Sequence, residues 1–209
     1  MRKFLVALAL LLPTLAGAST WDLDSAHTSV QFSVRHLMVS TVRGAFSKVS
    51  GAAQADDSDV TRSKVQATID AASIDTRNDK RDTHLKSADF LDVAKYPTIT
   101  FVSKKIERAS PGHFKVTGDL TLHGVTREVI LDVEGPTPEI KDPWGKTRAG
   151  AVATTTINRK DFGINWNQTL DAGGVAVGEE VSITIDVEAT KRAAVGAEKS
   201  VHQTAAGAK

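Results

Sequence analysis

The sequence contains no cysteine among its 209 residues. Disulfide bonds and lipid attachment at a cysteine are therefore excluded, so any folded domain depends on its own hydrophobic core. The motifs of several enzyme classes are also missing, since there is no GxSxG elbow, no glycine-rich phosphate loop and no HExxH. We predict no catalytic residue and no cofactor, although a Ser-His-Asp group assembled in space would leave no spacing to detect.

Long hydrophobic runs are nearly absent as well. The one apolar run, from Phe4 to Leu15, follows two basic residues and precedes small residues that end at Ala18. It is shorter than the roughly 20 residues of a membrane-spanning helix and is typical of a secretory signal peptide. We therefore expect a signal peptide at 1–18 and a mature chain with no integral membrane segment. We expect the mature chain in the periplasm, or outside the cell if the host has no outer membrane.

An excess of either charge is lacking too, with 26 Lys+Arg against 25 Asp+Glu. Nucleic-acid binding requires a basic surface, so this balance argues against a nucleic-acid partner. No two histidines are spaced two or four residues apart, as they are in many metal sites; they fall at positions 27, 36, 84, 113, 123 and 202. We therefore predict no metal site.

Apolar residues alternate with polar ones along much of the remaining chain. This period of two is typical of antiparallel strands with one apolar face. Further strands are expected at 42–55, 98–106 and 148–157, which gives about eight. The alternating sets are Val30, Phe32 and Val34; Val65, Ala67 and Ile69; Phe114, Val116, Leu120 and Leu122; Val129, Leu131 and Val133; Val181, Ile183, Ile185 and Val187.

Because few helices are expected, sheet must cover sheet, in either a sandwich or a closed barrel. A barrel of about eight strands either fills with side chains or holds one small ligand. Small residues at inward positions favour a cavity; they are Ala67, Gly118, Ala149, Ala151 and Ala153. After Thr190 the chain becomes rich in Ala, Gly and Lys, which predicts a flexible tail at 191–209 behind a barrel domain at 19–190.

The stretch 82–101, "DTHLKSADFLDVAKYPTITF", begins like a charged helix and ends like a strand. We expect a helix over 82–92 whose apolar residues Leu85, Phe90 and Leu91 cover the barrel interior. Tyr96-Pro97 then returns the chain to an extended conformation. This segment is either a lid over a cavity or a plug that completes the core.

Four long motifs resemble those of the YceI family, in the same order, from Trp21 to about Ala189. They are "WDLDSAHTSVQFSVRHLMVSTVRGAF", "DTHLKSADFLDVAKYPTITFVS", "GDLTLHGVTREVILDVE" and "INRKDFGINW". The resemblance implies an all-β fold, an extended eight-stranded antiparallel lipocalin-like β-barrel with short helices capping the ends. It also implies a hydrophobic channel for a polyisoprenoid or another long-chain lipid, no established catalytic residues, and a possible homodimer.

Candidate site residues fall into two groups. The predicted contacts to a lipid tail are apolar: Phe32, Val34, Phe46, Phe90, Phe101, Leu120, Leu122, Val129, Leu131, Phe162, Trp166, Val181 and Ile183. The predicted head-group residues are His36, Arg43, Arg81 and His84. A guanidinium suits an anionic head group because it forms bidentate, charge-assisted hydrogen bonds. We interpret Arg159 and Asp161 as a structural ion pair.

Three classes of function remain open. A carrier or sequestering protein for lipid is favoured by the predicted barrel, the signal peptide and the family motifs. An enzyme acting on a bound isoprenoid lipid would need a polar pair deep in the cavity. A structural or stress-protective envelope protein would have a filled barrel.

Overall fold

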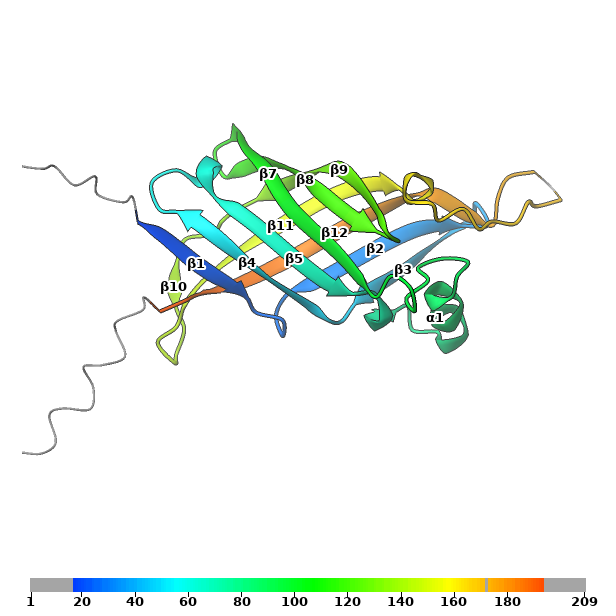
Figure 1. Cartoon of the computed structure of the whole chain (residues 1–209), viewed down its shortest axis with the longest axis horizontal. Coiled ribbons are helices and arrows are strands. Elements are labelled where there is room, and N and C mark those ends of the chain that lie inside the picture. Colours follow the sequence, from blue (N-terminus) through cyan, green and yellow to red (C-terminus); the bar gives the residue numbers. More distant parts are fainter. Residues whose placement is uncertain (1–16, 172, 194–209) are drawn as a thin grey trace, which may run out of the picture.

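The computed structural model describes residues 17–171 and 173–193 (Figure 1). The predicted signal peptide, apart from its last two residues, and the predicted tail from residue 194 lie outside this range. In chain order the elements are β1 (Ala18–Leu23), β2 (Ser29–His36), β3 (Ser40–Phe46), β4 (Val49–Asp56), the 3-10 turn η1 (Val60–Arg62), β5 (Lys64–Asp70), η2 (Ala71–Ser73), β6 (Ile74–Asp75), the helix α1 (Asp79–Lys86), β7 (Thr98–Ser110), β8 (His113–Leu122), β9 (Val125–Glu134), β10 (Ile140–Lys141), β11 (Thr147–Asn158), η3 (Arg159–Phe162) and β12 (Val177–Lys191).

Eight antiparallel strands close into a barrel, in the order β1, β4, β5, β7, β8, β9, β11 and β12, which confirms the predicted fold class. Strands β2, β3 and β6 continue the sheet from the edge of β12 that also pairs with β1. One edge of β12 pairs with β1 at Ala189–Lys191 and with β2 at Val177–Asp186. Strands β1 and β2 therefore lie end to end along β12. Strands β4 and β3 lie end to end beside them, which makes the barrel long and narrow.

The closure of the barrel is uneven along its length. Strands β11 and β12 pair from Arg148 to Asn158, whereas β9 and β11 pair only at 132–134 and 152–154. Beyond this short ladder the hydroxyl of Thr155 donates to the Ile130 carbonyl, at 2.9 Å. The ladder between β9 and β11 is therefore short, with three residue pairs, as is the ladder between β1 and β12.

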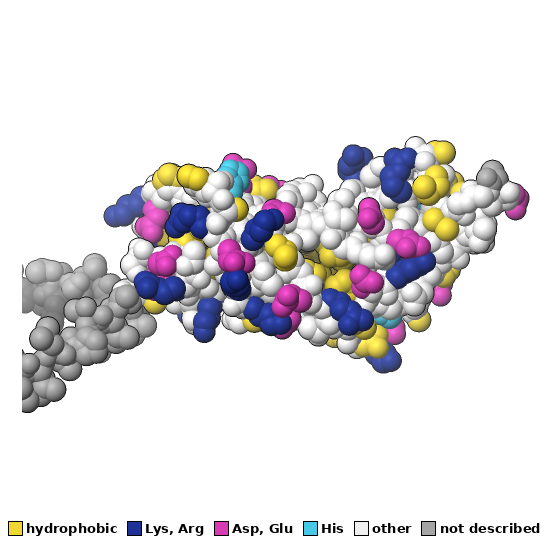
Figure 2. Space-filling model, turned by 90° about the horizontal axis from the view of Figure 1, so that it is seen from above, with side chains coloured by type: hydrophobic (Ala, Val, Ile, Leu, Met, Phe, Trp, Pro, Cys, Tyr) yellow, Lys and Arg dark blue, Asp and Glu magenta, His cyan; other side chains and the backbone are white. Residues whose placement is uncertain are grey.

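The period of two in the sequence corresponds to the two faces of the barrel wall. Along β12 the side chains of Val181, Ile183, Ile185 and Val187 point into the interior, and the intervening polar ones point outward. Figure 2 shows the result on one face, where charged side chains of both signs are interspersed and hydrophobic ones form only small groups. No helix among the described residues is long and apolar enough to span a membrane.

The helix differs from its predicted bounds of 82–92, because α1 covers only Asp79–Lys86. It begins early because the side chain of Asn78 accepts a hydrogen bond from the Arg81 amide, which caps the first turn. It ends at Ser87, and turns follow before β7 begins at Thr98, directly after Tyr96-Pro97 as expected. The prediction of a helix was therefore correct in kind but wrong in its bounds.

The hydrophobic core is concentrated at the end of the barrel that carries α1 (Figure 1). Phe90 and Leu91 lie in the turns after the helix and are buried there, although the sequence placed them on the helix. They pack with buried residues from several strands and from η3, namely Ala71, Ile74, Ile99, Leu122, Ile157, Phe162 and Ile164. A smaller cluster of Ile106, Phe114 and Val116 lies toward the other end.

Candidate ligand-binding site

The barrel encloses an elongated cavity of about 580 Å³. This volume lies in the range of small-molecule and cofactor sites. Inward side chains of most barrel strands line it, and almost all of them are apolar. Among the lining residues only Asp56, Asp57, Glu139 and Arg159 are charged, which indicates a ligand that is largely hydrocarbon.

Most of the predicted tail residues lie on this cavity. The lining ones are Phe32, Phe46, Phe90, Phe101, Leu120, Leu122, Val129, Leu131, Val181 and Ile183. Val34, Phe162 and Trp166 do not line it. Phe162 is 1% exposed inside the core, and the Trp166 ring packs against Phe90 and His84, with ring centroids 5.1 and 4.9 Å away. These two aromatic residues therefore pack outside the cavity, against the residues that close its end.

One end of the cavity is closed by the core. Ile74, Phe90, Leu91 and Ile164 line it there, and each is buried. The segment after α1 supplies two of these side chains, which explains why a polar helix interrupts a chain that otherwise forms strands. The helix faces water and holds an apolar turn against the barrel end.

The opposite end reaches solvent, because several residues that line the cavity there are exposed. We call this end the mouth and define it by Asp56, Asp57, Pro136, Thr137 and Glu139; the last four are exposed. Its acids have partners. Arg62 donates to both oxygens of Asp56, at 2.8 and 3.0 Å, and Lys191 lies 3.0 Å from Glu139. These bonds to Arg62 lower the pKa of Asp56 well below its ordinary value.

A YceI-like domain profile matches residues 21–189, nearly all of the barrel. The chain belongs to the YceI family. It is also 40% identical over 170 residues to UPF0312 protein SAS2572 from Staphylococcus aureus strain MSSA476. That match covers 81% of this chain and 96% of the relative, so the family assignment applies to the whole described barrel.

Solved structures share the barrel. BcnA from Burkholderia cenocepacia is 25% identical with a TM-score of 0.68, over 79% of this chain and 98% of that one. The YCEI protein of Campylobacter jejuni is 28% identical with a TM-score of 0.63, over 92% and 100%. A polyisoprenoid binding domain from Saccharophagus degradans is 15% identical with a TM-score of 0.60, over 82% and 98%. This last likeness shows the fold alone.

The four predicted head-group residues of this YceI protein are not among those that line the cavity. Arg43 is exposed and shares the outward parity of Ser33, its partner on β2. Arg81 donates to the hydroxyl and the carbonyl of Thr76, both at 2.7 Å. A head-group role for either would require a ligand that extends past the cavity wall.

The two histidines of that group lie at the closed end. His36 is the last residue of β2 and pairs with Ser40 across the hairpin. The Nε2 of His84 lies 2.8 Å from an oxygen of Asp89, and its ring meets Phe90 edge to face. The surroundings of His84 are therefore those of a residue that orients the turn after α1.

The surroundings of Arg159 differ from those predicted from the sequence. It is 4% exposed and donates to the backbone carbonyls of Ile164, Gly178 and Val177, at 2.7, 2.9 and 3.3 Å. The predicted ion pair with Asp161 is wrong, because all three acceptors are carbonyls. Burial lowers the pKa of Arg159. Its side chain also lines the closed end of the cavity, and no motif or spacing could have shown this.

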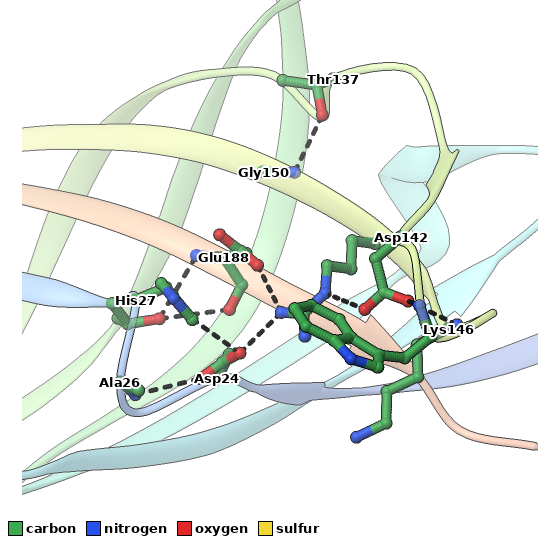
Figure 3. Close-up of polar contacts among 11 residues, drawn as sticks. Asp24, Ala26, His27, Thr137, Asp142, Lys146, Gly150 and Glu188 are labelled. Atoms are coloured by element: carbon green, nitrogen blue, oxygen red, sulfur yellow. Dashed lines mark hydrogen bonds and ion pairs between the residues drawn. The ribbon is translucent and has the colours of Figure 1, made fainter.

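A polar cluster on the barrel wall was also missed, because its members are far apart in sequence (Figure 3). Nη1 of Arg148 donates to Asp24, at 2.6 Å, and to Glu188, while Nε donates to Asp142 at 2.7 Å. His27 lies 2.9 Å from Asp24. We call these five residues the Arg148 clasp, because one guanidinium joins the β1–β2 connection, β12 and the turn before β11.

The clasp also contains three groups that meet a geometric requirement for a metal. The ligand atoms of Asp24, His27 and Glu188 all lie within 4.8 Å of one another. The carboxylates of Asp24 and Glu188 already accept hydrogen bonds from Arg148, however. The guanidinium of Arg148 therefore occupies the position between these two acids that a metal ion would take. The arrangement fits a structural joint better than a metal centre.

Proposed function

We propose that this YceI protein binds one long-chain amphiphilic lipid, a polyisoprenoid or a similar molecule, inside the barrel. The observation that supports this proposal is a narrow cavity of about 580 Å³ with apolar walls. One end of the cavity is closed by core residues, and the other end reaches solvent. Such a shape suits a hydrocarbon tail with a polar group left at the mouth. The neighbour described as a polyisoprenoid binding domain supports this choice of ligand class.

Burial of a hydrocarbon tail supplies enough free energy for tight binding. Each CH₂ contributes about 0.8 kcal/mol, so a five-carbon isoprene unit contributes roughly 3 to 4 kcal/mol before ordering costs. A few units are sufficient. The head group at the mouth, rather than the tail length, then distinguishes one ligand from another, because affinities saturate near about −18 to −21 kcal/mol.

We propose binding rather than catalysis. The one charged side chain among the cavity-lining residues of the closed end, Arg159, donates its hydrogen bonds to three backbone carbonyls, so none of these partners is an acid or a base. A filled, purely structural barrel is disfavoured by the cavity itself. We further propose that the chain transports, stores or sequesters its lipid in the periplasm, or outside the cell, on the strength of the predicted signal peptide.

Mass spectrometry of organic extracts from protein purified gently from its native host tests the proposal. We expect a stoichiometric long-chain lipid. A matched pair of variants on β11 makes the test specific: Ala151→Phe places a ring in the cavity, whereas Val152→Phe places it on the outer face, where Val152 is 39% exposed. The first variant should lose the lipid and the second should retain it. Extracts without lipid from wild-type protein would contradict the proposal.

The predicted homodimer is a separate proposal. Light scattering on the mature chain, at concentrations near those in the cell, tests it. A monomer throughout would remove the homodimer without affecting lipid binding.

A further inference from the structure

The turn that joins β10 to β11 exposes two large apolar side chains beside the mouth. We call residues 140–147 the mouth hairpin. Trp144 is 80% exposed and Ile140 is 62% exposed. The segment just before it carries Thr137 and Glu139, which line the cavity where it reaches solvent. An exposed indole therefore stands next to the opening of an apolar cavity.

The hairpin is braced, so the exposure of Trp144 is built into its fold. One oxygen of Asp142 accepts hydrogen bonds from the amides of Trp144 and Lys146, at 3.0 and 2.9 Å. The other oxygen accepts from Arg148, whose guanidinium also binds Asp24 and Glu188. Figure 3 shows how this clasp ties the turn to the barrel wall. The clasp fixes the backbone of the turn, and the indole points away from the core.

The charge of the hairpin is positive where it is exposed. Lys141 and Lys146 are both exposed, and neither forms an ion pair within the described parts of the chain. The acid of the hairpin, Asp142, accepts a hydrogen bond from Arg148, and its side chain is only 6% exposed, so it adds little to the charge at the surface. An indole flanked by two lysines is the composition that favours a membrane interface. The ring sits at the headgroup level, and the ammonium groups attract anionic phospholipids.

We propose that the mouth hairpin docks the barrel onto a bilayer that contains anionic phospholipid, with the mouth facing the membrane. A lipid then moves between bilayer and cavity without crossing open water. This docking surface goes beyond the proposed lipid binding, and it can be measured on protein that holds no ligand. A bilayer is favoured over a protein partner because the apolar area is small, the exposed charges of the hairpin are both positive, and the surface is continuous with a lipid-sized opening.

A second exposed apolar tip provides the matched control. Val39 is 79% exposed at the β2–β3 turn, almost the same as Trp144, but it lies at the closed end of the barrel. Arg35 braces this turn by donating to the Met38 carbonyl at 2.8 Å. If exposed apolar surface alone caused membrane binding, truncation of either tip would weaken it, each in proportion to the apolar area that it loses.

The experiment uses the full mature chain with vesicles of phosphatidylcholine alone or mixed with phosphatidylglycerol. Co-sedimentation gives the partition coefficient, and quenching of tryptophan fluorescence by brominated lipid reports insertion. We expect Trp144→Ala to weaken partition on the order of tenfold, because partial burial of an indole is lost. Lys141→Ala and Lys146→Ala should each weaken it about fivefold on the anionic vesicles only. Val39→Ala should change nothing.

A weaker partition of Val39→Ala, an unchanged partition of Trp144→Ala, or no binding by the wild type would overturn the proposal. If the wild type does not bind vesicles but is a dimer, and Trp144→Ala is a monomer, the mouth hairpin would instead be a dimer interface. Thermal unfolding of each variant checks the fold. Failure of docking and failure of lipid binding remain distinct. Docking is measured on ligand-free protein, whereas lipid content is measured in organic extracts.

Discussion

The ring of Phe101 on β7 lies across Gly118 on β8, so closely that a Cβ at Gly118 would stand 2.5 Å from the ring. Gly118 therefore does not widen the cavity directly, as its small size suggested, but gives the ring of Phe101 a place against the wall. Phe32 and Gly44 repeat the arrangement on β2 and β3, with the same 2.5 Å approach. Two glycines thus set how far two lining phenylalanines reach into the cavity.

Replacing Gly118 with Ala should push the Phe101 ring off the wall and narrow the cavity. We expect a loss of stability of about 1 to 3 kcal/mol, as for overpacked cores, together with weaker binding of a long lipid. Calorimetric unfolding and a lipid titration measure the two effects. In a Phe101→Leu background the same substitution should cost less, and additive losses in the double mutant would refute the contact.

Phe90→Ala separates a lid from a plug at the closed end. Phe90 is buried and lines the cavity, so its truncation should lower the free energy of unfolding by about 3 to 5 kcal/mol. If the segment after α1 forms part of the binding site, lipid affinity should fall as well. Phe162→Leu is the matched control, because Phe162 lies in the same core but not on the cavity. Unchanged affinity in Phe90→Ala would leave only the plug.

Arg159→Met should destabilise the closed end strongly. The substitution keeps much of the side-chain volume but leaves the carbonyls of Ile164, Val177 and Gly178 without their charged donor. Because hydrogen bonds to charged groups contribute about 1.5 to 3 kcal/mol each, we expect a loss of about 3 kcal/mol or more. Chemical denaturation measures it. A change below about 1 kcal/mol would show that water replaces the guanidinium.

The head-group prediction for Arg43 and Arg81 can be tested with one tail length and two head groups, one anionic and one neutral. Because Arg43 faces outward and Arg81 holds Thr76, we expect Arg43→Ala to be silent and Arg81→Ala to lower the melting temperature. Affinity for both head groups should stay at the wild-type value. A selective loss for the anionic lipid would restore the head-group role.

The Arg148 clasp should make stability depend on pH through His27. The hydrogen bond with Asp24 raises the pKa of His27 above its ordinary value of about 6.5. A raised folded-state pKa adds stability that is complete below about pH 6.5 and is lost as the pH rises through the raised value. The difference in unfolding free energy between wild type and His27→Gln should therefore shrink with rising pH.

The carboxylates of the clasp act in the opposite direction. Hydrogen bonds from Arg148 lower the pKa of Asp24 and of Asp142. Their stabilisation is complete above about pH 4 and is lost as the pH falls through the lowered values. Unfolding curves of Asp142→Asn against wild type below pH 4 should converge, and a constant difference would contradict the clasp.

The fold could be predicted from the sequence because the patterns that specify strands and turns are local. Alternation along a strand shows which side chains face inward, and nine of the ten predicted tail residues that line the cavity lie on strands, among them Ile183 and Leu131. The alternating sets also gave about eight strands, and the resemblance to the YceI family then implied a barrel rather than a sandwich. Tyr96-Pro97 marked the start of β7, and the charged residues of the helix predicted over 82–92 indicated that a helix in this segment would face water.

Tertiary structure alone decided where the polar groups stand. The sequence pointed to Arg43 and Arg81 as head-group residues, but the cavity reaches solvent beside Asp57 and Glu139 and is not lined by either arginine. Strand parity does not show which end the core closes, because that depends on how segments from η3 and from the turns after α1 pack together. The clasp of Arg148 and the burial of Arg159 were hidden for the same reason. Some partners of each arginine, such as Asp24 for Arg148 and Gly178 for Arg159, come from other parts of the chain, and only the folded barrel brings them within hydrogen-bonding distance.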